Sequence, residues 1–160
     1  MQSHFRLFIL QLRPITQRDN AMSTEEQLSV EMPEEALIVR DYLDASMKPD
    51  PDLAATYVAS NVVITFTGGR VYDHPSGPTA FNAGRYKWVK KKMDTFDVAT
   101  GGGRTVVYSV GTLYGEWPDG TPFEGNRYVD RFEVENGKIV KMDVWNDSAE
   151  RILTRMGIEA

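Results

Sequence analysis

Asp130 is the residue best suited by type and position to chemistry, because it lies in a strand pattern that alternates apolar and polar residues. Residues two apart on a strand point to the same face. The residues that share the face of Asp130 are Asn126, Tyr128, Phe132 and Val134. Burying an unpartnered carboxylate costs roughly a few kcal/mol, so this acid must be neutralised or paired. A pocket that raises its pKa would make it a general acid or base or a hydrogen-bond donor, whereas an adjacent arginine or tyrosine would make it a structural acceptor.

Two further residues are candidates for proton transfer. Tyr42 is predicted on the apolar side of the first helix, where its hydroxyl could contact a ligand or be satisfied within the core. His74 lies in a predicted loop at the mouth of the pocket and can exchange protons near neutral pH, although loop histidines are often only solvated. The candidate catalytic residues are therefore Asp130, Tyr42 and His74.

Aromatic and apolar residues on the predicted inner faces of the same elements would form the walls of a pocket. They are Phe66, Trp88, Tyr128, Phe132, Met142 and Val144. Asn146 shares the inner face of the last predicted strand, so it is either a polar ligand contact or a cap for the final helix. Such a pocket would bind a small hydrophobic or aromatic ligand.

The elements that must position these residues begin with helices. Apolar residues at helical spacing predict helices over 33–47, 53–59, 80–93 and 148–156, and Asp50 is the predicted cap of the second. Five basic residues make the third of these helices positively charged, which is typical of a solvated face: Arg85, Lys87, Lys90, Lys91 and Lys92.

Strands follow the helices along most of the chain. The β-branched run 62–67 predicts the first strand, and 70–79, with two prolines and a glycine, predicts a loop. Four more strands are predicted at 96–99, 104–117, 122–134 and 138–147, and Asn136-Gly137 predicts a tight hairpin between the last two. This order predicts an α+β fold in which a curved antiparallel sheet wraps around helices, as a cone-shaped barrel with an internal pocket.

Composition narrows the classes of function. With 18 basic and 23 acidic residues the net charge is −5, which disfavours a nucleic-acid partner. No apolar run approaches the roughly 20 residues of a membrane span, so a soluble, cytoplasmic protein is expected. The lack of cysteine and the presence of only two histidines argue against a metal site, and no cofactor is expected.

The chain length of 160 residues predicts a single domain. We expect residues 1–28 to be a tail and residues 29–160 to form that domain. The sequence Met22-Ser-Thr-Glu-Glu is typical of a start, so residues 1–21 could be an upstream extension.

The order of elements and the Gly-Lys-Ile-Val-x-Met motif over 137–142 resemble the nuclear transport factor 2-like superfamily, which includes ketosteroid isomerases, polyketide cyclases and limonene-epoxide hydrolases. The resemblance covers residues 34–150. It implies that Tyr42 and Asp130 correspond to the hydrogen-bond donors that hold the enolate in ketosteroid isomerases. Phe66 stands where those isomerases carry their proton-shuttling carboxylate, and Val144 stands where epoxide hydrolases carry an aspartate. A polyketide cyclase needs a single acid or base, which Asp130 could supply.

The resemblance therefore implies a cofactor-independent isomerase, cyclase or dehydratase that acts on a small hydrophobic carbonyl compound. The alternative is a ligand-binding or dimeric accessory domain without turnover. The outward side of the last strands mixes charge with a large aromatic residue, which favours a homodimer through this surface. The residues that would form it are Arg127, Val129, Arg131, Asp143 and Trp145.

Overall fold

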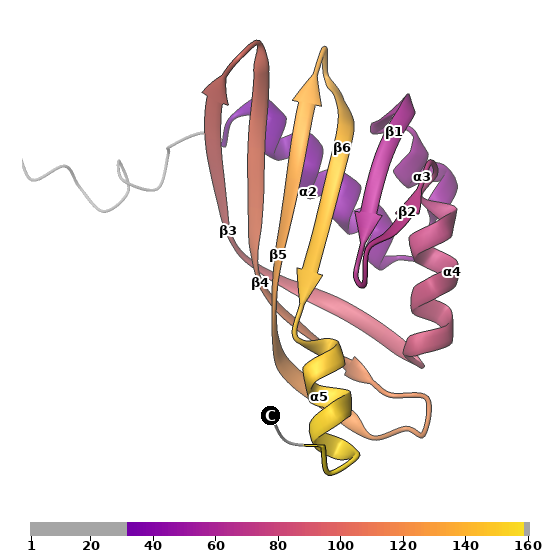
Figure 1. Ribbon diagram of the computed structural model, residues 1–160. Helices are drawn as coiled ribbons and strands as arrows, with labels where there is room; N and C mark the ends of the chain where they lie inside the picture. Colours follow the sequence, from indigo (N-terminus) through magenta and orange to yellow (C-terminus); the bar gives the residue numbers. More distant parts are fainter. Residues whose placement is uncertain (1–31, 159–160) are drawn as a thin grey trace, which may run out of the picture. The chain divides into compact units, whose positions relative to one another are not determined.

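A computed structural model describes residues 32–158, which form four helices and six strands (Figure 1). The first elements are α2 (Glu34–Met47), α3 (Pro51–Ala55), β1 (Val58–Phe66), β2 (Arg70–Tyr72) and α4 (Ser76–Arg85). They are followed by β3 (Trp88–Gly101), β4 (Arg104–Glu116), β5 (Pro122–Glu135), β6 (Lys138–Asn146) and α5 (Ser148–Arg155). The predicted α+β class is confirmed. The tail predicted for residues 1–28 lies outside the described residues.

The strands of the described residues form one curved sheet in the order β2-β1-β6-β5-β4-β3. Only β1 and β6 are parallel, and the remaining neighbours are antiparallel. Four of the five ladders contain register shifts, which bend and twist the strands locally. Because β2 and β3 remain unpaired edges, the expected cone is an open curved sheet and not a closed barrel (Figure 1).

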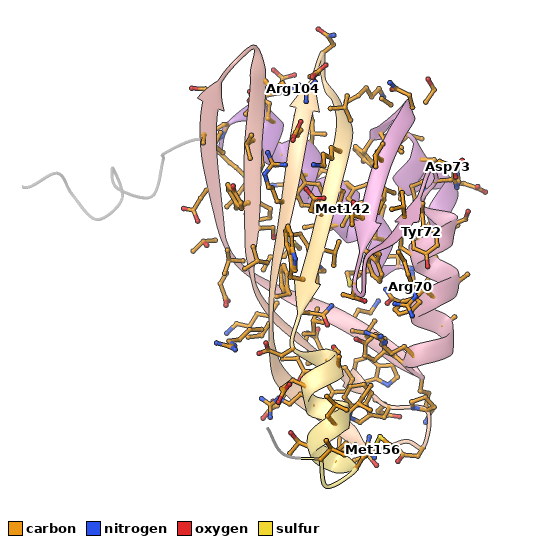
Figure 2. All side chains as sticks on the ribbon, in the orientation of Figure 1. Arg70, Tyr72, Asp73, Arg104, Met142 and Met156 are labelled. Carbon is orange, nitrogen blue, oxygen red and sulfur yellow. The ribbon has the colours of Figure 1, made fainter. Side chains whose placement is uncertain are left out.

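Helix α2 covers one face of this sheet, because its apolar residues recur at helical spacing. Val39, Tyr42 and Leu43 are at most 2% exposed. Burying a side chain such as Val39 or Leu43 contributes about 1.5–3 kcal/mol. On the sheet side, the core residues include Ile64, Val107, Phe132, Ile139 and Met142, the last of which is labelled in Figure 2.

The helix predicted over 80–93 is wrong in its second half. Helix α4 ends at Arg85, and β3 begins at Trp88 and pairs with β4 from Trp88 opposite Glu116 to Gly101 opposite Arg104. Backbone hydrogen bonds along this long hairpin outweigh the weak preference for helix in the segment. The basic run therefore lies on a strand, where alternation puts Lys91 on the inner face with Val89 and Met93.

The loop predicted over 70–79 is confirmed only at 73–75 and is wrong on both sides of it. Its first residues form β2, which pairs with the end of β1, and α4 already begins at Ser76. Arg70 and Tyr72 of β2 lie beside α4 (Figure 2). The helix predicted over 53–59 is shorter and lies earlier, because α3 runs from Pro51 to Ala55 and β1 starts at Val58.

Two local predictions are confirmed. The Asp50 side chain accepts a hydrogen bond of 2.9 Å from the Leu53 backbone N–H and caps α3. Asn136 and Gly137 both have positive φ, 48° and 70°, as the tight hairpin between β5 and β6 requires. Among the described residues, no helix is long and apolar enough to span a membrane.

Candidate active site

The centre of the site is a buried ion pair between two strands that are separated by β4. Asp130, in the middle of β5, is fully buried, and the Lys91 side chain of β3 is only 8% exposed. The Lys91 Nζ donates a hydrogen bond to Asp130 Oδ2. The same Nζ lies 3.7 Å from the centre of the Tyr128 ring, where the π-electrons favour a cation. Asp130 is therefore paired, as its burial requires.

Burial and ion pairing shift the pKa values of Asp130 and Lys91 in opposite directions. Burial raises the pKa of the Asp130 carboxyl, and the Lys91 charge opposes this rise. Burial also lowers the pKa of the Lys91 amine, and Asp130 opposes this fall. Desolvation thus brings the neutral pair closer in free energy to the ionic pair, so a proton can pass between Lys91 and Asp130 more easily than between two solvated groups.

The second oxygen of Asp130 has no hydrogen-bond partner within residues 32–158. Asp130 Oδ1 is buried, and Asp130 lines a cavity beneath α2. A buried polar atom without a partner costs about 1–3 kcal/mol. This oxygen is therefore suited to accept a hydrogen bond, or a proton, from a molecule in the cavity.

The cavity has an inner and an outer chamber. The inner chamber, about 50 Å³, is bounded by Asp130 and Lys91 and has mostly apolar walls. A water needs about 10–15 Å³ in this measure, so the chamber fits a few waters or the reacting end of a ligand. The outer chamber, about 270 Å³, lies between the end of α2, helix α4 and the start of β3. Both chambers are bordered by Ser46, Asn82 and Tyr86, so the outer one adjoins the inner one.

Several residues predicted from the sequence border the inner chamber. Besides Asp130 they are Tyr42, Phe66, Met142, Val144 and Asn146. Tyr42 is 2% exposed, and burial raises the pKa of its hydroxyl, so the phenol stays protonated and can donate a hydrogen bond. Asn146 serves the second role considered for it as well, because its Oδ1 accepts a hydrogen bond of 3.0 Å from the Ser148 N–H at the start of α5.

The other predicted residues lie outside the inner chamber. Tyr128 and Phe132 flank Asp130 on β5 but pack within the interior. The Tyr128 hydroxyl is 2.9 Å from Ser109 Oγ, and burial raises the pKa of this hydroxyl to about 12. Trp88 borders the outer chamber and is 41% exposed. His74 is exposed on the loop before α4, with its Nδ1 2.9 Å from Ser76 Oγ.

Lys91 is the residue of the candidate site that was not predicted from the sequence, where it was assigned to a solvated helix face. The signal that could have found it is the length of the β3–β4 hairpin: a strand of 13 residues after the Gly101–Gly103 turn needs a partner of similar length before it. Counting back from the turn extends the strand to Trp88 and places Lys91 between Val89 and Met93 on the inner face.

The described part of the chain has no cluster of side chains suited to hold a metal ion. Residues 32–158 contain no group of three or more histidine, cysteine, aspartate or glutamate side chains that could hold a metal ion. The polar groups around the cavity are instead one carboxylate, one amine, hydroxyls and amides. This set can hold a polar group of an organic ligand and move a proton.

The curved sheet, with α2 over a cavity that holds a buried acid, defines a protein of the nuclear transport factor 2-like class. A protein of this class, of unknown function, from Burkholderia pseudomallei K96243 superposes with a TM-score of 0.62 at 22% identity, over 76% of this chain and 96% of that chain. A putative SnoaL-like polyketide cyclase from Jannaschia sp. CCS1 gives a TM-score of 0.58 at 16% identity, over 75% of this chain and 90% of its own. TerC, crystallised with polyporic acid, gives a TM-score of 0.59 at 14% identity, over 80% of this chain and all of the TerC chain.

At these identities the likeness shows a shared fold. The model of the SnoaL-like domain matches residues 39–142, which is more than half of the sequence. The chain belongs to the SnoaL-like domain family. None of the curated proteins matches the sequence.

Proposed function

We propose that this protein binds a small hydrophobic carbonyl compound and acts on it without a cofactor, by acid–base chemistry of the isomerase, cyclase or dehydratase type. The observation that carries the proposal is Asp130, a residue that lines a mostly apolar cavity and whose buried Oδ1 has no hydrogen-bond partner among the described residues. Such an oxygen can take a proton from a ligand carbon or hydroxyl.

Each charged or polar group around the cavity has a role in this proposal. Asp130 acts as the base on the carbon next to the carbonyl group. Lys91 holds the other carboxylate oxygen and orients it. Tyr42, a protonated phenol, donates a hydrogen bond to the oxygen that becomes negatively charged. His74 takes no part, because its exposed ring contacts Ser76 and does not border either chamber.

The comparisons support a small-molecule ligand. The chain belongs to the SnoaL-like family, and proteins of similar fold include a putative polyketide cyclase and a protein crystallised with polyporic acid. The apolar walls of both chambers favour an aromatic or alicyclic ligand whose polar group reaches Asp130.

The test starts with a thermal-shift screen of aromatic and terpenoid ketones. Compounds that raise the Tm are then followed by proton NMR in D₂O, which measures exchange of hydrogen next to the carbonyl. Asp130→Asn should reduce catalysed exchange by about 10²–10⁴-fold, the usual contribution of a general base. Glu133→Gln, on the opposite face of the same strand, should keep the exchange rate and serves as the control.

Folding must be separated from catalysis, because Asp130→Asn leaves a buried amine without its partner. The double variant Asp130→Leu/Lys91→Met removes the same oxygen without a buried charge. Full exchange activity in either folded variant would contradict the role of Asp130. Binding of ketones without exchange in the unmodified protein would favour the alternative, a ligand-binding module without turnover.

We also propose a homodimer through the outer face of the sheet. Val129 and Trp145, paired on neighbouring strands, are 38% and 56% exposed. Exposed apolar side chains rimmed by charges are typical of protein interfaces. Sedimentation equilibrium should show a dimer that dissociates in Trp145→Asp, and a monomer at all concentrations would contradict this proposal.

A further inference from the structure

We propose that Lys91 forms an imine with the carbonyl group of the ligand, so that this cavity works by covalent amine catalysis. The inference rests on the proposed function for the class of ligand, a ketone or aldehyde. The imine adds a covalent step and a second reacting residue to the proposed acid–base reaction.

The position of the Lys91 amine is the first argument. Its side chain is 8% exposed and borders the inner chamber together with Asp130, which it contacts, so a carbonyl group in this chamber lies near both side chains. Other lysines in ion pairs are far more exposed: the side chains of Lys87, Lys92 and Lys141 are 59%, 74% and 41% exposed. Among these paired lysines, Lys91 is the one placed in an apolar enclosure.

The environment of the amine is the second argument. An amine attacks a carbonyl only when it is neutral, and burial favours the neutral form of Lys91. Asp130 is in direct contact and can take the proton, since burial also favours its protonated form. Proton transfer within the pair removes two buried charges at once, which offsets the loss of their attraction.

The step balances with these two residues alone. The ammonium of Lys91 passes a proton to the Asp130 carboxylate, and the neutral Nζ forms a bond to the carbonyl carbon. The carbonyl oxygen takes up the proton that the attacking nitrogen loses, the resulting hydroxyl leaves as water with the proton from Asp130, and a C=N bond replaces the C=O bond. The products are a positively charged iminium on Lys91, an ionised Asp130 and one water, which the adjoining outer chamber can receive.

The iminium then makes the proposed proton transfer easier. It withdraws electrons from the neighbouring carbon, whose proton passes to the Asp130 carboxylate and leaves an enamine. Asp130 thus serves both steps, first as the proton carrier for Lys91 and then as the base. The buried ion pair has a chemical use in this scheme besides its structural one.

The experiment is reductive trapping on the full chain. The protein is incubated with acetophenone, 4-phenylbutan-2-one or 2-tetralone in the presence of sodium cyanoborohydride, which reduces iminium to a stable secondary amine. Peptide mass spectrometry then locates the adduct. With at least one ketone, modification of Lys91 should exceed that of Lys92 by about tenfold or more, because reactivity follows the fraction of free amine and the enclosure of the site.

Two variants make the result specific. Lys91→Arg keeps the positive charge beside Asp130 but cannot form the imine, so the adduct at this position and the ketone-dependent exchange should both be lost. Lys92→Arg, a change at the neighbouring exposed lysine, should leave both unchanged. Modification of Lys91 no greater than that of Lys92 with all three ketones overturns the inference.

Failure of the imine and failure of the proposed function give different results. Ketones that raise the Tm and exchange their hydrogens, but leave no adduct at Lys91, overturn the imine and keep the acid–base proposal. Full exchange activity in Lys91→Arg has the same meaning. Ketones that neither bind nor exchange overturn both.

Discussion

The two faces of β5 carry two ion-pair sites that differ in how their carboxylates are held. On the inner face Asp130 has one partner, Lys91, and one oxygen without a partner in the described chain. On the outer face Glu133, three residues along, is 2.7 Å from Arg131 and 2.5 Å from Arg104, so both of its oxygens are bonded. Figure 2 labels Arg104, which lies near the turn between β3 and β4.

The pKa values of the two carboxyls shift in opposite directions. Burial raises the pKa of Asp130. The hydrogen bond from Arg131 lowers the pKa of Glu133, although its side chain is only 9% exposed. The difference shows that partner number, and not burial by itself, separates a carboxylate held for structure from one available for proton transfer.

The largest effect is expected from Lys91→Met, which leaves Asp130 buried without a partner. The free energy of unfolding at neutral pH should fall by about 3–5 kcal/mol. In this variant the pKa of Asp130 in the folded state rises further above that of the unfolded chain. The variant is therefore most stable below the pKa of the unfolded carboxyl, where Asp130 is protonated in both states, and loses stability as pH rises through the folded-state pKa. Urea denaturation at acid and neutral pH should show a smaller defect in acid. A defect equal at both pH values would contradict this account.

Restoring a neutral site should recover most of that loss. Lys91→Met/Asp130→Leu removes both charges, and replacing a buried pair by apolar residues is often neutral or stabilising by about 1–4 kcal/mol. The double variant should therefore be clearly more stable in urea than Lys91→Met. Additive losses from the two changes would show that the sites are not coupled.

The ion pairs of Glu133 with Arg104 and Arg131 on the outer face should stabilise the protein with the opposite pH dependence, and salt should weaken them. Glu133→Gln should cost about 1 kcal/mol at neutral pH and low salt, as expected for a partly screened pair. The Glu133 contribution is present above the pKa of the unfolded carboxyl and is lost as pH falls through the lowered pKa of the folded state. Adding salt should reduce this cost and leave the Lys91→Met defect nearly unchanged. Equal salt sensitivity of the two variants would contradict the contrast between the faces.

The smallest effect is expected at the exposed neighbour of Lys91. Lys92 is 3.8 Å from Asp94, and both side chains are largely solvated. Lys92→Gln should leave the midpoint of urea denaturation unchanged, because exposed ion pairs contribute little. A clear loss of stability would mean that the basic run is important for a reason other than the position of Lys91.

Local patterns predicted much of the fold and half of the central pair. Alternation along 126–134 placed Asp130 on the inner side, and the Asn136-Gly137 turn and the Asp50 cap formed as expected. Segment 87–93 was predicted wrongly because Val89 and Met93, four apart, suit one face of a helix and one face of a strand equally well.

By itself the sequence determined the α+β order, the turns and the direction in which Asp130 points, because these follow from short-range backbone preferences and from a period of two. Only the tertiary structure decided that Asp130 meets Lys91, whose position is 39 residues away along the chain. The pairing of β3 with β4 sets that meeting, since the long hairpin turns Lys91 toward Asp130, while the side chain of Lys92 stays largely exposed.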